Sequence, residues 1–195
     1  GLYYPAQIYV ESGTGVSLSN TIFYAKTGTN VLTLLTETGI TVSSDYNTYY
    51  KNGNNNLVYY NGGLYADLAA WSGNGAGADD LESDPDFVTP GSDFHIKSVN
   101  ESYHSGEWPP ETAISGIWTI DATTSPALDA GDPADPFANE PVSGSRINQG
   151  AYGNTPQASK SAGLLWDGST DSDWQDVTNW TPEQIPISTD DIVIP

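Results

Sequence analysis

A short repeat in the first 60 residues constrains the fold of this chain more than any other feature. Residues 15–20, GVSLSN, are echoed 24 positions later by residues 39–44, GITVSS. A second match follows between residues 20–24, NTIFY, and residues 47–50, NTYY. Apolar and polar residues alternate within each run, which is the periodicity of a strand, and clusters of Gly, Asn and Ser separate the runs as turns do. The pattern predicts several short strands in each period, with no helix between them.

This organisation predicts the coils of a right-handed parallel β-helix and an all-β fold class. Each coil would add one strand to each sheet, about 4.8 Å from the last, and Asn20 would stack on Asn47 as a ladder. An antiparallel sandwich built from hairpins is the alternative, because turn-separated strands of this length suit both folds. Sixty residues supply only two or three coils, too few to stand alone in a repeat architecture, so we expect further coils to precede them.

The rest of the chain divides by composition. Leu64, Leu68 and Trp71 would share one face of a short amphipathic helix. The predicted units are terminal β-helix coils over 1–60, a closing region over 61–155, a linker over 156–163, and the start of a second β-rich module over 164–195. The closing region contains the short helix and irregular chain rich in Asp, Pro and Trp, and it would cover strand edges that otherwise recruit another chain.

The charge excludes several kinds of partner. Five Lys and Arg stand against 25 Asp and Glu, which gives a formal net charge of −20. Such a chain cannot neutralise phosphates, so nucleic acid is excluded, and anionic membrane surfaces would repel it. No apolar run approaches the roughly 18 residues of a membrane span, so we expect no direct membrane insertion. There is no Cys, hence no disulfide, and no Met, from which we expect a processed chain or a piece of a longer one.

Several ordered blocks resemble the final coils of right-handed parallel β-helix proteins of the pectate-lyase-like superfamily. The blocks are residues 20–24, 44–50, 83–87 and 91–98, followed by 125–132 and 146–153, which match the segment that closes many of those helices. The resemblance covers roughly residues 8–160. It implies the fold, and it says little about activity, because one scaffold hosts many chemistries.

The tail is similar to the opening of a different module. Its pattern is Trp166-Asp167-Gly168, then Trp174, Asn179-Trp180 and Pro186. A β-rich module with this pattern recurs in very large secreted proteins of the Bacteroidota and continues well beyond the point where this chain stops. The resemblance implies export to the cell surface or medium, often through the type IX secretion system, and makes the secretion translocon a candidate partner.

Oxygen-donor side chains cluster in the closing region and suggest calcium. The predicted calcium ligands are Asp129, Asp132, Asp135, Asn139 and Glu140. Ca²⁺ takes six to eight hard oxygen ligands, although this spacing does not match an EF-hand loop. A second acidic cluster comprises Asp79, Asp80, Glu82, Asp84 and Asp86. The alternative for both clusters is that loop acids accept hydrogen bonds from backbone amides in Asx-turns.

No catalytic residue is predicted. With 25 acids, a pair spaced for glycoside hydrolysis is expected by chance, and a polysaccharide lyase would need Lys or Arg beside a bound uronate. His95 and His104 can serve as bases or metal ligands, but the alternation around His95 favours a histidine on the surface of a strand. Arg146 can bind an anion, or it can pair with nearby carboxylates or closing-loop carbonyls.

Aromatic residues are the remaining functional hint. Stacked coils can bring some of six tyrosines into a sugar-binding stripe, although Tyr is also common on strands because it packs well there; the six are Tyr46, Tyr49, Tyr50, Tyr59, Tyr60 and Tyr65. We therefore expect a non-catalytic structural or adhesive segment of a large secreted or cell-surface β-helix protein that contacts a polysaccharide or cell-surface ligand, or that is carried as secretion cargo. The alternative is the C-terminal part of a polysaccharide lyase or glycoside hydrolase whose catalytic coils lie upstream.

Overall fold

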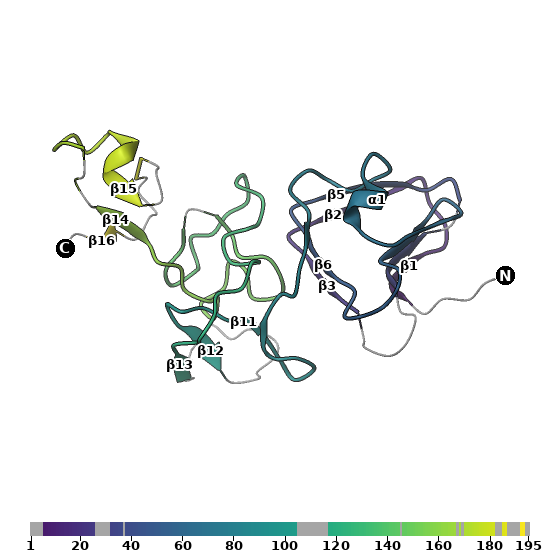
Figure 1. Ribbon diagram of the computed structural model, residues 1–195, viewed down its shortest axis with the longest axis horizontal. Coiled ribbons are helices and arrows are strands. Elements are labelled where there is room, and N and C mark those ends of the chain that lie inside the picture. The colour runs from purple at the N-terminus through teal and green to yellow at the C-terminus, as the bar shows by residue number, and fades with distance from the viewer. Residues whose placement is uncertain are drawn as a thin grey trace.

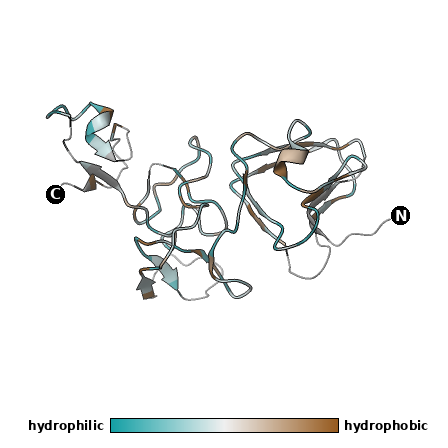
Figure 2. Ribbon diagram, in the orientation of Figure 1, coloured by the Kyte–Doolittle hydropathy of each residue, from teal (hydrophilic) through white to brown (hydrophobic). Residues whose placement is uncertain are grey.

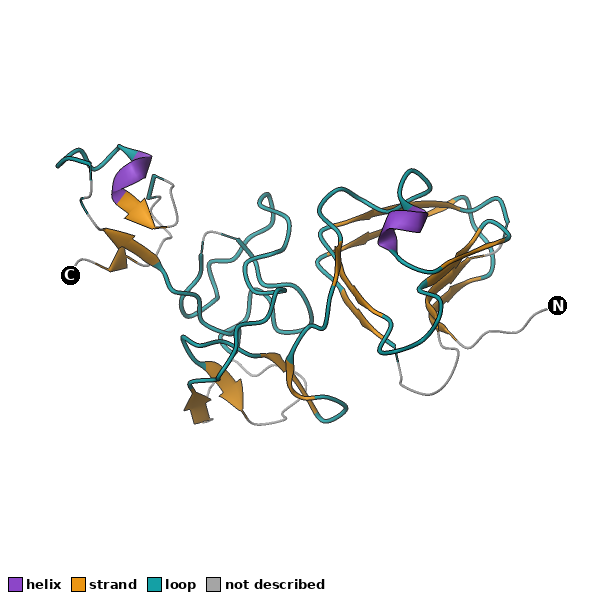
Figure 3. Cartoon of the chain, viewed as in Figure 1, coloured by secondary structure: helices purple, strands orange, loops and turns teal. Residues whose placement is uncertain are grey.

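The computed structural model is predominantly β, with almost no helix among the residues it describes (Figure 3). Those residues are 6–25, 32–36, 38–104, 117–144, 146–166, 168, 170–181, 185–186 and 192–193. Strands are short, two to five residues each, and they form small sheets of two to four strands. Regions rich in Gly, Asn, Asp and Pro separate them, as the turn chemistry of these residues predicts.

The first part of the chain passes repeatedly through the same three sheets. The first pass comprises β1 (Ala6–Val10), β2 (Gly15–Ser19) and β3 (Ile22–Tyr24), and the second comprises β4 (Leu32–Thr36), β5 (Thr41–Asp45) and β6 (Thr48–Tyr50). A third, partial pass contributes β7 (Val58–Tyr60) and β9 (Leu81–Glu82). Equivalent strands pair in parallel, β1 with β4 and β7, β2 with β5, and β3 with β6 and β9. The prediction of parallel pairing is confirmed for these strands, which form a closed circuit at the N-terminal end (Figure 1).

The register differs from the one that the repeat predicts. Gly15 pairs with Thr41 and Ile22 with Thr48, an offset of 26 residues instead of 24. A slip of two residues leaves every side chain on the same face, so alternation alone cannot distinguish the two registers. The predicted ladder of Asn20 on Asn47 is wrong for the same reason. Asn20 is equivalent to Tyr46, since both hold a left-handed corner, with φ of 51° and 56°.

An aromatic core fills the circuit. Phe23 stacks on Tyr49 with 4.6 Å between ring centroids, and Trp71 meets Tyr49 edge-on at 5.9 Å. Val42 and Val58 complete this core, and the strands and α1 around it carry the hydrophobic residues coloured brown in Figure 2. Side chains that repeat at one position in successive passes therefore stack directly on one another, which is the source of the core.

The predicted helix is shorter than its pattern. Only α1 (Leu68–Trp71) is helical, and Asp67 caps it by accepting a hydrogen bond from the Ala70 amide. Leu64 lies instead in β8 (Gly63–Tyr65), an antiparallel partner of β7, and is 41% exposed. The Asx cap at Asp67 starts the helix one turn later than the apolar spacing suggests.

The closing region has little regular structure. It contains the antiparallel pair β10 (Phe87–Thr89) and β11 (Asp93–Ile96) and the antiparallel pair β12 (Ser102–His104) and β13 (Ile117–Thr119). A second core of Phe87, Ile96 and Ala127 packs against Ile22 and Tyr24 of β3. Residues of the predicted linker pack here too, since Gln157 and Ser159 are buried. The predicted unit boundaries stay a prediction.

The C-terminal unit is built on three tryptophans. β14 (Leu164–Trp166) lies between β15 (Trp180–Thr181) and β16 (Ile192–Val193), and a 3₁₀ turn, η1 (Val177–Asn179), precedes β15. Trp180 is buried edge-on against Trp166 and Trp174, at centroid distances of 5.0 and 4.5 Å. Of the helical segments that the structure describes, none has the length and hydrophobicity to cross a membrane.

Candidate functional site

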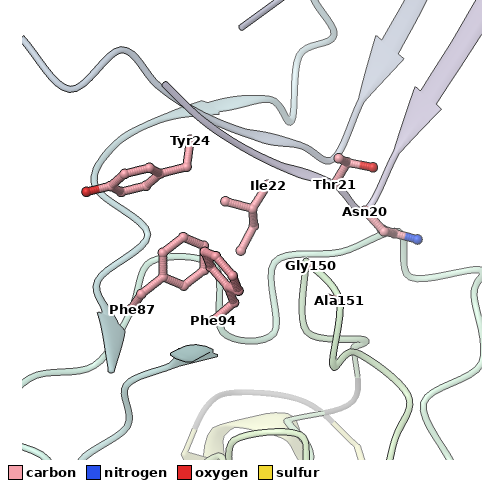
Figure 4. Close-up of a pocket in the computed structure, with 8 residues that line it drawn as sticks. All are labelled: Asn20, Thr21, Ile22, Tyr24, Phe87, Phe94, Gly150 and Ala151. Carbon is pink, nitrogen blue, oxygen red and sulfur yellow. The ribbon is translucent and has the colours of Figure 1, made fainter. Parts of the chain in front are cut away.

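A cleft of about 570 Å³ opens between β3 and the closing region. We call it the aromatic cleft. Its lining residues, drawn in Figure 4, are Asn20, Thr21, Ile22, Tyr24, Phe87, Phe94, Gly150 and Ala151. Ligand sites typically occupy concave, mostly apolar spaces of this size at the junction of two parts of a fold. The aromatic cleft is therefore the candidate binding site.

Strand alternation places the β3 side of the cleft. Phe23 points into the core of the circuit and is 2% exposed, so its neighbours Ile22 and Tyr24 point outward toward the closing region. Gly150 closes the junction by donating its amide hydrogen to the Asn20 carbonyl at 2.8 Å. It has a φ of 97°, and a Cβ there would lie 2.8 Å from Ile22 Cδ1, so only Gly allows this close approach.

The opposite wall is aromatic and partly open to solvent. Phe87 meets Tyr24 and Phe94 with 5.4 Å between centroids in each pair, and Phe94 stands nearly perpendicular to it. These are the tilted and edge-to-face geometries that aromatic pairs prefer. Phe87 is 5% exposed whereas Phe94 is 45% exposed. Phe94 is therefore an anchored but accessible ring at the mouth of the cleft.

Cations that the structure describes are already engaged. Lys51, Lys97 and Lys160 each pair with a carboxylate, at 3.0, 2.7 and 2.5 Å. Arg146 donates two hydrogen bonds from Nε and Nη2 to the Gly131 carbonyl, at 2.9 and 2.6 Å. The predicted pairing of Arg146 with a closing-loop carbonyl is confirmed. None of these four side chains lines the aromatic cleft.

Carboxylates flank the cleft at both ends. Asn20 bridges the first two, because its Nδ2 donates to the Asp135 carboxylate and its Oδ1 accepts the Asp132 amide hydrogen at 2.7 Å. At the other end, burial and the charge of Asp84 raise the pKa of Tyr24, so the phenol stays protonated. The field inside the cleft is therefore negative.

The five predicted calcium ligands are spread over separate roles. Asp132 Oδ1 accepts the Ala134 amide hydrogen in an Asx-turn, and Asn139 donates its own amide hydrogen to Asn154 Oδ1 at 3.1 Å. Across the described ranges, no three His, Cys, Asp or Glu side chains are grouped so that they could hold a metal ion. Calcium binding stays a prediction, and the geometry gives these acids backbone-capping roles.

Two of these five carboxylates are largely enclosed by the closing region. Glu140 Oε1 accepts amide hydrogens from Asn148 and Asn154, both at 2.9 Å, while Oε2 is buried without a partner. Burial raises the pKa of Glu140 to about 7. Asp129 accepts the Ser161 hydroxyl and the Gly144 amide hydrogen, and burial raises its pKa too.

An asparagine that the sequence argument placed only in a ladder is the centre of a hydrogen-bond network. Asn47 is fully buried, and its Oδ1 accepts the Thr21 amide hydrogen of the previous pass. Its Nδ2 donates to the carbonyls of Leu18 and Asp45 and to Asp80 Oδ1, all within 3.0 Å. Asp80, from the second acidic cluster, also accepts the Ser44 hydroxyl and the Gly77 amide hydrogen. These bonds join three passes.

His95 lies in the interior, so the surface assignment is wrong. It is fully buried and stacks on Tyr152 with 3.5 Å between centroids, and Tyr103 packs against it at 5.3 Å. Its Nδ1 is 2.6 Å from Asp93 Oδ1, and burial lowers the pKa of the imidazole, which is neutral in the folded chain. Neighbouring Phe94 takes the exposed face instead, because the closing region covers the other face of β11.

His104 is near a serine and an aspartate but cannot act as a catalytic triad. Its Nε2 lies 3.0 Å from Ser102 Oγ and 3.1 Å from Asp121 Oδ1. The Ser102 hydroxyl donates to Asp121 Oδ2. In a triad the serine and the carboxylate bind opposite imidazole nitrogens, whereas here both face the same one.

The predicted tyrosine stripe is not formed by exposed rings. Tyr49 is fully buried, and the other five tyrosines of that set are half-buried. The aromatic residues that are brought together, Tyr24, Phe87 and Phe94, come from segments more than 60 residues apart. No local signal in the sequence connects them.

Comparison with known proteins adds no identity. The chain matches no family model, no curated protein and no solved structure. The fold and the geometry of the aromatic cleft are therefore the basis for a functional assignment.

Proposed function

We propose that this chain is a non-catalytic, adhesive segment of a large secreted or cell-surface protein, and that its aromatic cleft contacts a cell-surface glycan. In this proposal residues 6–82 form the last coils of a right-handed parallel β-helix, the closing region ends it, and the C-terminal unit begins a second β-rich module. Export through the type IX secretion system belongs to the same proposal.

The β-helix assignment is supported by the order in which the sheets are filled. Three sheets receive one strand each, in the same sequence, on the first and second passes, with a common offset of 26 residues. A connection between parallel strands of one sheet is right-handed in nearly all folds, which supports the hand. The continuous network at Asn47 supports a stack whose passes are fixed in register.

The adhesive role depends on one observation, the exposure of Phe94 at the mouth of a cleft walled by other apolar side chains. Phe94 is 45% exposed, although Phe87 and Ile96 of the same hairpin are 5% exposed. Apolar surface left open at the rim of a concave site marks a place of binding. The lining contains no carboxylate, imidazole or amine, which supports binding in preference to catalysis.

A retention assay tests this proposal. The purified chain is incubated with a panel of insoluble polysaccharides and with intact cells, and the bound fraction is measured. We expect retention on some member of the panel, and we expect Phe94→Ala to abolish it. Trp174→Ala is the matched control, because Trp174 is 42% exposed in the C-terminal unit and does not line the cleft. Equal retention of wild type and Phe94→Ala on every surface would refute the adhesive role of the cleft.

A further inference from the structure

We infer that the aromatic cleft selects uncharged glycans and rejects polyuronates, an inference that rests on the proposed adhesive function. The argument combines three properties of the cleft, namely its aromatic wall, the state of its polar groups and the charge around it. Together they fix the class of sugar, which the adhesive role alone leaves open.

The aromatic wall suits the apolar face of a pyranose ring. Tyr24, Phe87 and Phe94 form one connected set of rings, in which Phe87 is held between the other two. Because Phe87 is packed in the second core with Ile96 and Ala127, the set is anchored to the closing region. Rigid aromatic rings provide contact area at a low cost in conformational entropy. A pyranose can lay its C–H face on this wall.

The polar groups at the rim suit hydroxyl partners. The Thr21 hydroxyl donates to the Ser19 carbonyl at 2.9 Å, so its oxygen is left to accept a hydrogen bond from a ligand. The Tyr24 phenol stays protonated, because burial and Asp84 both raise its pKa, and a phenol can donate or accept. Asn20 is fixed by Asp132 and Asp135, which orients its amide before any ligand arrives. All of these groups are uncharged.

The charge around the cleft opposes acidic sugars. A uronate carboxylate brought into the cleft would need a cation, and the Lys and Arg side chains in the described part of the chain are bound elsewhere. Asp84 at one end and Asp132 and Asp135 at the other would repel it. Desolvating an unpaired carboxylate is costly, and the net charge of −20 adds a long-range repulsion.

A matched pair of ligands tests the inference. Calorimetric titration of the full chain compares fully methyl-esterified oligogalacturonide with the same oligosaccharide after saponification, alongside neutral β-glucan, xylan, mannan and galactan oligosaccharides. We expect at least one neutral ligand to bind. We also expect the methyl ester to bind more tightly than its acid, with a gap that narrows in 0.5 M salt, because salt screens the repulsion.

Variants separate this inference from the proposed function. Phe94→Ala should weaken the neutral ligand at least tenfold, Phe94→Trp should retain it, and Trp174→Ala should leave it unchanged. Tighter or equal binding of the acid, or retention on acidic polysaccharides or cells that is sensitive to Phe94→Ala with no neutral ligand bound, overturns the neutral-glycan inference and leaves the adhesive role standing. Neutral binding that Phe94→Ala does not affect overturns both.

Discussion

The buried carboxyl of Glu140 should make the closing region less stable at neutral pH than at mildly acidic pH. Burial, together with the charge of Asp129, raises the pKa of Glu140 from 4.5 to about 7. The folded chain therefore binds this proton more tightly than the unfolded chain does. The stability that protonated Glu140 contributes is complete below pH 4.5 and is lost as the pH rises through 7.

The magnitude follows from the size of the shift. A pKa displaced from 4.5 to about 7 corresponds to about 3 kcal/mol between the two limits, at about 1.4 kcal/mol for each unit. Glu140→Gln keeps the Oε1 acceptor for the amides of Asn148 and Asn154 and removes the charge. We expect this variant to match wild type near pH 4.5 and to exceed it by about 3 kcal/mol at pH 8.

Urea unfolding at a series of pH values from 4.5 to 8 measures this difference. Groups present in both proteins cancel, including His95, whose lowered pKa gives a contribution of the opposite sign: present above about pH 6.5 and lost as the pH falls through the folded pKa. Glu11→Gln is the control, because Glu11 is exposed, and its curve should run parallel to wild type. If the curves of wild type and Glu140→Gln are also parallel, the buried carboxyl does not titrate as argued.

Three further predictions concern the parts that hold the fold together. Asn47→Ala should destabilise the chain by about 3 kcal/mol in urea unfolding, because it leaves buried partners of Asn47 unsatisfied, whereas Asn55→Ala at an exposed turn should change stability by less than about 0.5 kcal/mol. Trp180→Ala should cost about 3–5 kcal/mol and unfold the C-terminal unit first, seen as loss of amide protection there while the passes stay protected. The predicted calcium site should raise the melting temperature in calcium relative to EGTA, and an unchanged midpoint removes it.

Strand direction could be predicted from the sequence, but register could not. Alternation of apolar residues in 15–20 and 39–44 predicts strands, and the absence of a helix between repeats predicts parallel pairing. The observed offset of 26 differs from 24 by two residues, which preserves the inward and outward faces. The corners would have distinguished the two, but Asn20 marks one left-handed corner and Tyr46, a residue that rarely adopts it, marks the next.

The site was less predictable than the fold because it is made by tertiary packing. Tyr24 and Phe94 come from a strand of the first pass and from a hairpin of the closing region, and nothing between them in the sequence signals the contact. The alternation around His95 gave two faces but not which face is covered. The closing chain covers the His95 face, through Tyr152, so Phe94 is left in the open.

The acids of the closing region explain how a chain with so few strands there can hold a defined cleft. Glu140 fixes the Asn148 amide, Gln149 donates its amide hydrogen to the Ala127 carbonyl and accepts the Thr48 hydroxyl, and Gly150 then meets the Asn20 carbonyl. Each bond replaces one that a sheet would have supplied, since buried backbone groups must find partners in irregular chain as well. The side-chain carboxylates and amides are therefore spent inward, as backbone partners. What remains to line the cleft is apolar and uncharged, and this division of roles is why binding, and not acid–base chemistry, is the function that the cleft supports.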